Sequence, residues 1–238
     1  MSTSVDSGIE IQGQRVALPV HVRDAGSGNA MFLVPAEAAQ RLIPGDAFRV
    51  IEAAPGQAQL LLGIIDYRDN DLGDYDEVAV IFFVTPNGQE EADPGTFIAR
   101  LPVNQSFTCE AGCAIWGFPK TVDEIDFEYT DTHAGCRLEM DGQHVLTLRL
   151  PRGGEGGDPT PDDETVGPTY TYIEGVPHRT TFSTAGRTLV TPGPAGVELT
   201  LGEHPLAKEL KRLGLPKPAI MSTWNEHMRG RFEAPAKL

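Results

Sequence analysis

Two near-continuous apolar runs stand out in the chain, at residues 58–65 and 78–84. Both are rich in Leu, Ile, Val and Phe, and both are shorter than a typical helix. A continuous apolar run of this length is typical of a strand that is buried on both of its faces. We therefore predict that these two segments are central strands of a sheet.

Shorter extended segments fill most of the remaining chain. Residues 15–22 and 30–34 are strand candidates separated by the glycine-containing turn at 24–29. Further strands are predicted at residues 96–102, 121–129, 136–140, 145–150, 169–173, 179–182, 188–190 and 197–201. Because strands dominate and no alternation of strand and helix is visible, the pattern indicates an antiparallel β-rich barrel or sandwich.

Two helices are predicted to cover the strands. The first begins at Pro35, whose missing N–H is harmless at the first helical position, and it ends before Pro44. The second spans residues 204–213 with its leucines on one side, and Gly214 is suited to the left-handed residue that ends a helix. The predicted fold class is therefore α+β, mainly antiparallel β, with two or so flanking helices.

The chain of 238 residues is predicted to form a single domain. Residues 1–12 begin with small and polar side chains, which indicates a flexible tail. Residues 152–167 are dominated by glycine, proline and acidic residues, and this composition cannot build a core. We interpret that segment as a surface loop rather than a domain linker, because the strand-like segments on its two sides look alike.

Charge and cysteine content narrow the partners and the compartment. The net charge of −15, with no basic patch before the C-terminal segment, argues against a nucleic-acid partner. No apolar run reaches the ~18 residues that a membrane span needs. The three cysteines form no Cys-x-x-Cys pair and follow no secretory segment, which favours a reduced cytoplasmic compartment.

An acidic stretch at residues 66–77 holds six carboxylates and one arginine. It resembles a calcium loop at first sight, but Gly73 falls where a ligand should stand and the twelfth position from Asp69 is Val80. Most of these acids fit a solvated turn between two strands. Glu77 differs because it directly precedes the apolar run at 78–84, where it is suited to proton transfer. The scattered histidines and cysteines show no ligand spacing, so we predict no metal site.

Lys120 is the only lysine among the first 207 residues, and it follows the apolar segment Trp116-Gly-Phe-Pro. One interpretation is a lysine whose stem packs on Trp116 while its ammonium stays in water. The other is a nucleophile, because Pro119 makes the backbone rigid and desolvation lowers the pKa of a lysine amine. A neutral amine condenses with a ketone to an iminium, which accepts an electron pair from a neighbouring bond.

The segment Trp116-Gly-Phe-Pro-Lys120 resembles the lysine motif of the acetoacetate decarboxylase superfamily. The resemblance extends over most of the chain, including the loop Leu72-Gly-Asp-Tyr-Asp-Glu77. It implies a barrel-like core with flanking helices, a homo-oligomer, and Lys120 as the Schiff-base lysine. It further implies Glu77 as an active-site acid, and it makes Arg23 the nearest match to an active-site arginine. Two departures, Thr121 in place of a second lysine and Leu62 in place of a second glutamate, argue against acetoacetate as the substrate.

These residues predict a lyase without a cofactor that acts on a small oxo acid. Lys120 forms the iminium, Arg23 holds the substrate carboxylate by paired hydrogen bonds, and Glu77 moves protons. Trp116 and Phe118 bind the substrate and exclude water. The reaction is either decarboxylation of a β-oxo acid or aldol condensation and dehydration with an aldehyde, and the two departures favour the second. The alternative is a non-catalytic barrel that binds a small apolar metabolite.

Overall fold

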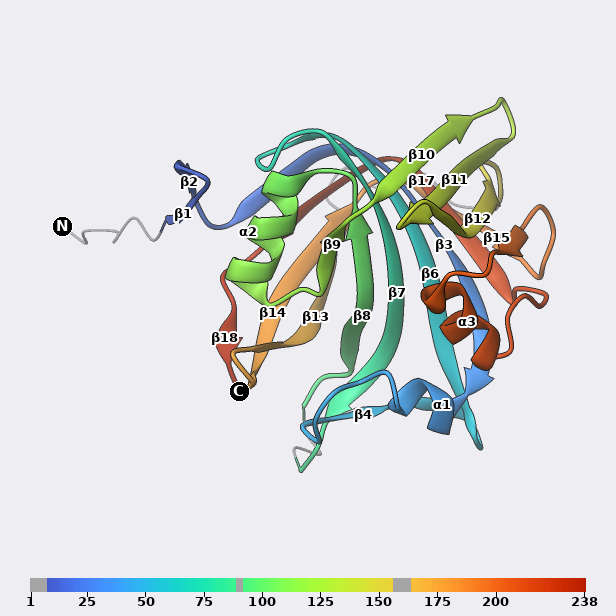
Figure 1. The fold of residues 1–238 in the computed structure, drawn as a ribbon, viewed down its shortest axis with the longest axis horizontal. Helices are drawn as coiled ribbons and strands as arrows, with labels where there is room; N and C mark the ends of the chain where they lie inside the picture. The colour runs from blue at the N-terminus through green and yellow to red at the C-terminus, as the bar shows by residue number, and fades with distance from the viewer. Residues whose placement is uncertain (1–7, 89–91, 156–163) are drawn as a thin grey trace.

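A closed seven-stranded barrel forms the centre of the computed structural model, which describes residues 8–88, 92–155 and 164–238 (Figure 1). Its strands follow the order β17-β3-β6-β7-β8-β13-β14, and β14 pairs back to β17. All neighbours are antiparallel except β8 and β13, which are parallel. The strands are β3 (Val20–Pro35), β6 (Gln57–Asn70), β7 (Tyr75–Pro86), β8 (Gly95–Val103), β13 (Glu164–Ile173), β14 (Val176–Ala185) and β17 (Met221–Phe232). The predicted barrel and its antiparallel character are confirmed.

A four-stranded antiparallel sheet packs against the outside of the barrel, in the order β10-β11-β12-β16. Its strands are β10 (Glu124–Tyr129), β11 (His133–Met140), β12 (Gln143–Pro151) and β16 (Glu198–Leu201). The helices α1 (Ala36–Gln40) and α3 (Pro205–Arg212) contribute to the same hydrophobic core. Short strands lie at the margins: β1 (Ile9–Ile11), β2 (Gln14–Val16), β4 (Phe48–Val50), β5 (Glu52–Ala54), β9 (Lys120–Val122), β15 (Thr188–Pro192) and β18 (Ala236–Lys237).

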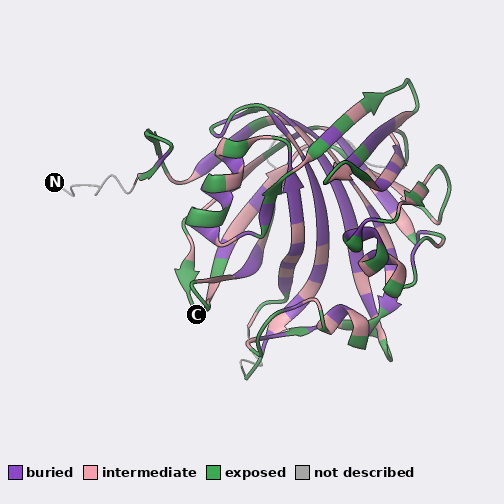
Figure 2. Ribbon diagram, viewed as in Figure 1, coloured by how far each residue is buried: buried purple, intermediate pink, exposed green. Residues whose placement is uncertain are grey.

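The two apolar runs lie on β6 and β7, and side chains from both faces of these strands are buried (Figure 2). Leu62 and Val80 belong to the core between the barrel and the outer sheet. Tyr67 and Ala79 belong to a second core inside the barrel. The prediction of strands buried on both faces is confirmed, because one face is covered by the outer layer and the other faces the barrel interior.

A third helix, α2 (Ser106–Trp116), packs on the inner core and was not predicted. Its N-terminus is capped by Gln105, whose side chain accepts a hydrogen bond from the Thr108 N–H at 2.8 Å. Gln is not among the residues preferred at this position, so the start of the helix carries no strong sequence signal. None of the helices in the described ranges is long and apolar enough to cross a membrane.

The two segments predicted to lack structure are more ordered than expected in the parts that the structure describes. Residues 1–7 of the predicted tail lie outside the described residues, but β1 pairs with β2 and Ile11 is buried. Residues 156–163 of the predicted loop also lie outside the described residues, whereas 164–167 belong to β13. A polar composition hid these strands, because β-strand pairing uses backbone groups that composition does not reveal.

Candidate active site

The backbone brings Lys120 into the barrel through a turn that depends on glycine. Gly117 ends α2 with a φ of +68°, and a Cβ there would lie 2.3 Å from the carbonyl oxygen of Tyr172. No other residue type fits that position without moving backbone. The chain then forms β9, in which Lys120 pairs in parallel with Leu101 of β8. The side chain of Lys120 is therefore directed inward, and only 4% of it is exposed.

Glu77 is the direct partner of the lysine. Its Oε2 atom lies 2.9 Å from Nζ of Lys120, and 8% of its side chain is exposed. The ammonium also donates to Oγ1 of Thr108 on α2 at 3.1 Å and to the hydroxyl of Tyr75 at 3.5 Å. The structure thus brings together the two residues predicted to be catalytic, in a pocket where neither charge is solvated by bulk water.

The predicted lowering of the Lys120 pKa is wrong. Burial by itself lowers the pKa of this lysine, but the carboxylate of Glu77 and the phenol of Tyr75 raise it by more, so the net shift is upward. Desolvation alone lowers the pKa of a lysine, but the sequence does not reveal that a buried carboxylate lies at hydrogen-bonding distance. The amine becomes a nucleophile only after a proton has left it, and Glu77 is the carboxylate in contact with it.

Two tyrosines complete the polar part of the site. Tyr67 and Tyr75 stack with ring centroids 4.4 Å apart, and the Tyr67 hydroxyl lies 3.5 Å from Oε1 of Glu77. Burial, and then the charge of Glu77, raises the pKa of Tyr67 well above its usual value, and burial also raises that of Tyr75. Both phenols therefore keep their protons at neutral pH and can donate hydrogen bonds to an oxygen that becomes negative.

Trp116 and Phe118 lie where the sequence predicted. Together with Phe232 they line a cavity of about 30 Å³ that includes Lys120 and Glu77. The rings of Trp116 and Phe118 stack at 5.7 Å, and the Trp116 indole N–H donates to the carbonyl of Glu233 at 2.9 Å. These fixed rings separate the amine from solvent. Their role in substrate binding stays a prediction.

Arg23 is not part of this pocket. It alternates on β3 with Val20 and Val22, which line the cavity, so its own side chain points outward. There it pairs with Asp69 at 2.8 Å and Asp71 at 2.5 Å, and about half of it is exposed. The prediction that Arg23 holds the substrate carboxylate is therefore wrong. Among the described residues that line the Lys120 cavity, no arginine occurs.

Four residues of the site were missed from sequence. Tyr75 stood inside the quoted loop motif, and strand alternation with Glu77 places both on one face. Tyr67 was missed because β6 continues into the acidic stretch. Thr108 and Gly112, which lies against the side-chain stem of Lys120, were missed because they belong to the unpredicted helix α2.

The two departures from the family pattern lie away from the amine. Thr121 points outward, and its hydroxyl donates to Asp123 at 2.6 Å. Leu62 packs in the outer core, whereas its neighbour Leu61 faces the barrel interior. Leu61 therefore lines the inner cavity, as Ile65 and Tyr67 of the same strand do.

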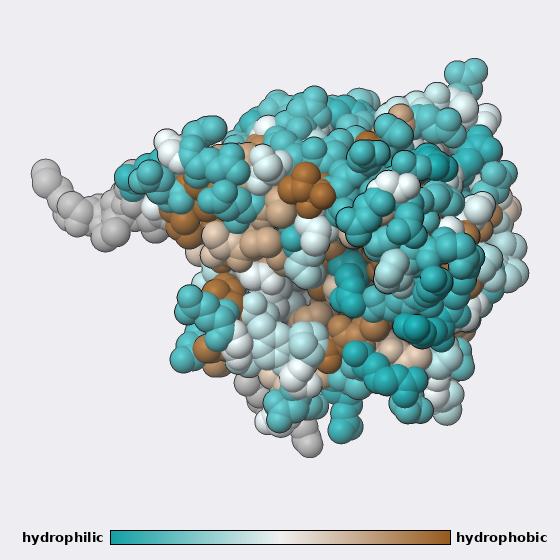
Figure 3. Space-filling model, in the orientation of Figure 1, coloured by the Kyte–Doolittle hydropathy of each residue, from teal (hydrophilic) through white to brown (hydrophobic). Residues whose placement is uncertain are grey.

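A larger hollow of about 750 Å³ lies outside the barrel, between α1, α3 and β8 (Figure 3). Hydrophobic side chains form its floor, and Arg41, Arg100 and Arg212 stand around it. Nη2 of Arg100 contacts both carboxylate oxygens of Glu209, at 2.7 and 2.9 Å. Thr121 lines this hollow and Lys120 does not. We therefore do not assign the reaction to it, although it is larger than the cavity around Lys120.

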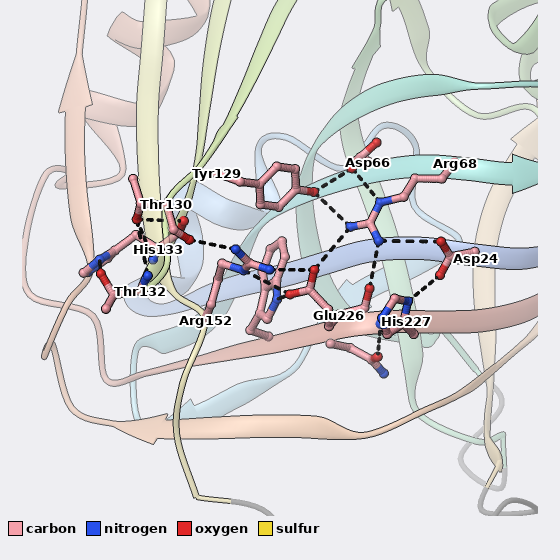
Figure 4. Close-up of polar contacts among 12 residues, drawn as sticks. Asp24, Asp66, Arg68, Tyr129, Thr130, Thr132, His133, Arg152, Glu226 and His227 are labelled. Carbon is pink, nitrogen blue, oxygen red and sulfur yellow. Dashed lines mark hydrogen bonds and ion pairs between the residues drawn. The ribbon is translucent and has the colours of Figure 1, made fainter.

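A polar network also lies on the outer side of the barrel, around Arg68 (Figure 4). Arg68 contacts Asp66 at 2.9 Å, the Tyr129 hydroxyl at 3.2 Å and Glu226 at 3.7 Å. Arg152, the residue that follows β12, forms an ion pair with the same Glu226 at 2.8 Å. Because each cation faces a carboxylate, we interpret the network as a structural contact that holds the outer sheet against the barrel.

Comparisons with known proteins find a matching family model and proteins of similar fold. Residues 15–232 match the family described as Acetoacetate decarboxylase (ADC). No curated protein sequence matches significantly. Among solved structures, acetoacetate decarboxylase from Legionella pneumophila is 16% identical with a TM-score of 0.66, covering 92% of this chain and 87% of that one. The enduracididine biosynthesis enzyme MppR, complexed with the condensation product of pyruvate and imidazole 4-carboxaldehyde, is 15% identical with a TM-score of 0.61, covering 92% and 88%. An acetoacetate decarboxylase-like enzyme from Sphingomonas wittichii RW1 is 17% identical with a TM-score of 0.58, covering 97% of both chains. At these identities the likeness is one of fold.

Proposed function

Because the chain belongs to the acetoacetate decarboxylase family, we propose that it is a lyase whose Lys120 amine forms a Schiff base with the carbonyl of a small oxo acid. The observation that supports this most is the 2.9 Å contact between Nζ of Lys120 and Oε2 of Glu77 in a nearly closed pocket. A buried amine beside a buried carboxylate can exchange one proton without either charge being left alone.

The first half of the reaction follows from that exchange. Glu77 accepts a proton from the Lys120 ammonium, and the neutral amine adds to the substrate carbonyl to give a carbinolamine. The phenols of Tyr67 and Tyr75 are placed to donate hydrogen bonds near that oxygen. Glu77 then returns its proton to the carbinolamine hydroxyl, water leaves, and the iminium carries the positive charge.

The iminium accepts an electron pair in one of two ways. A β-oxo acid breaks its bond to the carboxylate, carbon dioxide leaves, and the resulting enamine is protonated. Alternatively, Glu77 removes a proton from the carbon next to the iminium, the enamine attacks an aldehyde, and water leaves the adduct. In both cases water finally hydrolyses the iminium and frees Lys120.

Condensation with an aldehyde is the outcome we favour. A second cavity of about 260 Å³ shares Glu77 and Tyr67 with the lysine pocket, and it offers room for a second reactant. Loss of carbon dioxide from a small oxo acid needs no such space. The MppR complex, which holds a condensation product of pyruvate with an aldehyde in the same fold, supports this choice.

Reduction with borohydride tests the proposal. With pyruvate present, the reagent should convert the iminium to a stable amine and add the mass of the reduced adduct to the peptide that contains Lys120. Lys120→Arg should show no adduct, because a guanidinium does not form an iminium at neutral pH. An unmodified wild-type peptide across a panel of oxo acids would overturn the proposal. Carbon dioxide release and the ultraviolet absorbance of a conjugated product then separate the two reactions.

A non-catalytic barrel makes the opposite prediction for the same variant. If the pocket only binds a metabolite, Lys120→Arg keeps the positive charge opposite Glu77 and should retain ligand affinity. The proposed lyase loses all turnover in this variant while remaining folded.

A further inference from the structure

The second cavity inside the barrel exists because small residues occupy matching positions on three strands. The strand register places Ser27 beside Ile65 and Asn29 beside Gly63, and Gly63 beside Ala79. A Cβ at Gly63 would lie 2.8 Å from the Oδ1 atom of Asn29. The missing side-chain volume at this level of the barrel leaves the space of about 260 Å³ next to Glu77.

The lining of this cavity differs in character from the aromatic walls around Lys120. Besides Tyr67, eight of its side chains are uncharged and carry hydroxyl or amide groups: Ser27, Asn29, Thr96, Thr169, Thr184, Thr188, Thr223 and Asn225. In the described lining, Glu77 is the only charged residue. The cavity therefore has a largely apolar wall that carries several hydroxyl and amide groups, and none of its described lining residues is cationic.

Half of these eight polar side chains are hydrogen-bonded to one another. The hydroxyls of Thr96 and Thr169 lie 2.9 Å apart, and Asn225 donates to Thr188 at 3.3 Å. The side chains of Ser27, Asn29, Thr184 and Thr223 form no hydrogen bond within the part of the chain that the structure describes. Polar groups that line a cavity without a protein partner are available to hydrogen-bond a ligand.

We infer that this cavity binds the uncharged, hydroxyl- or amide-bearing part of the aldehyde that reacts with the enamine, an assignment that rests on the proposed function. A carboxylate or phosphate here would lose its hydration beside Glu77, and no cationic side chain among the described lining residues would compensate, which costs several kcal/mol. A purely apolar chain would leave the four free side chains without partners and lose about 1–3 kcal/mol for each group it desolvates. A neutral chain with several hydrogen-bonding groups avoids both costs.

The cavity also has room beyond these groups. A further space of about 200 Å³ shares Asn29 and Thr223 with it and ends at Met31 and Met221. Ser27 and Met31 lie on one face of β3, and four residues of strand span roughly 13 Å. The bound chain can therefore extend several carbon atoms past the polar groups, toward the methionines.

Saturation-transfer NMR with three four-carbon probes tests the assignment without any covalent chemistry. The probes are erythritol, which is neutral and hydroxylated, erythronate, which adds a carboxylate, and 1-butanol, which is mainly apolar. In wild-type protein we expect erythritol to receive at least threefold more saturation than erythronate or 1-butanol. Thr223→Val keeps the shape but removes a free hydroxyl, and Asn29→Leu removes the amide. Each should reduce the erythritol signal at least twofold and increase that of 1-butanol.

Thr121→Val is the matched control, because it removes a hydroxyl that points away from the cavity, and its signals should equal those of the wild type. Equal or stronger saturation of erythronate in the wild type, or an unchanged erythritol signal in Thr223→Val, would overturn the assignment. If Asn29→Leu does not fold, the erythritol signal of Thr223→Val is sufficient to test the assignment. None of the probes forms a Schiff base, so failure here is separate from failure of borohydride trapping at Lys120.

Discussion

Gly112 of α2 lies directly against the stem of Lys120: a Cβ at position 112 would stand 2.6 Å from Cδ and 2.8 Å from Cε of the lysine. The absence of a side chain at Gly112 thus leaves a channel for the stem of Lys120, which reaches Glu77. Thr108, one turn earlier on the same face of the helix, accepts a hydrogen bond from the ammonium. Helix α2 therefore sets the position of the amine.

Gly112→Ala should separate helix stability from activity. Alanine is favoured over glycine inside a helix by about 1 kcal/mol, but its methyl group displaces the buried lysine stem. We expect turnover with an oxo acid and an aldehyde to fall at least tenfold, while the circular dichroism spectrum stays that of the folded protein. Ala114→Ser, at an exposed position of α2, is the control and should keep full activity. Wild-type turnover in Gly112→Ala would show that the channel does not position the amine.

Glu77→Gln keeps the volume of the side chain and removes its ability to exchange protons. Without the carboxylate, the strongest interaction that raises the pKa of Lys120 is lost and this pKa falls, so the amine still forms an adduct. Turnover should fall roughly 10²–10⁴-fold, because proton transfer in both directions is lost. Steady-state rates measured beside borohydride trapping check both parts. Retention of more than a tenth of the wild-type rate would remove Glu77 from the mechanism.

Arg23→Ala should leave the reaction unchanged. Its guanidinium points away from the pocket and is held by Asp69 and Asp71, so it makes no contact with the space around Lys120. We expect KM for the oxo acid and kcat to stay within twofold of the wild type. A rise in KM of tenfold or more would restore Arg23 as the group that recognises the carboxylate.

Asp76 gives a stability prediction with a defined pH dependence. Burial, followed by the charge of Asp66, raises the pKa of Asp76 to about 7 from its usual 3.8. The folded protein therefore holds this proton more tightly than the unfolded chain, and ionisation destabilises the fold. The cost is absent below pH 3.8, develops as the pH rises, and is complete above about pH 7.

Asp76→Asn cannot ionise, and its amide oxygen can still accept the 2.8 Å hydrogen bond from Asn104. Solvent screening reduces the gain to the order of 1 kcal/mol, which is about 2–4 °C in Tm for a chain of this size. We expect the variant to melt higher than the wild type at pH 8 and at the same temperature at pH 4. Calorimetry that gives the same difference at both pH values would contradict the cause assigned here. The variant also serves as the control for Glu77→Gln, since it changes the adjacent acid on the outer face of β7.

The sequence was informative wherever burial leaves a pattern. The apolar runs at 58–65 and 78–84 identified the two central strands, and the isolated Lys120 identified the nucleophile that we propose. Side-chain direction was harder to obtain. Arg23 directly follows Val22 on a strand whose Val20 and Val22 face the cavity, and simple alternation would have placed it outside the barrel had the ends of the strand been known.

Other parts of the site depend on contacts between distant segments. Thr108 reaches Lys120 only because α2 folds over the end of the barrel, and the Tyr67–Tyr75 stack requires the pairing of β6 with β7. The upward shift of the Lys120 pKa has the same origin, since Glu77 comes from another strand. The homo-oligomer and the cytoplasmic compartment rest on the sequence alone and stay predictions.

The central claim is that the Lys120 amine forms a covalent bond with a substrate carbonyl carbon. A crystal of the protein soaked with pyruvate measures this directly. We predict electron density that continues from Nζ of Lys120 into the second carbon of pyruvate, with the carboxylate of Glu77 within hydrogen-bonding distance of the adduct. Pyruvate bound only at another site would contradict the account. An unmodified Lys120 still paired with Glu77 after soaking at a saturating pyruvate concentration would contradict it as well.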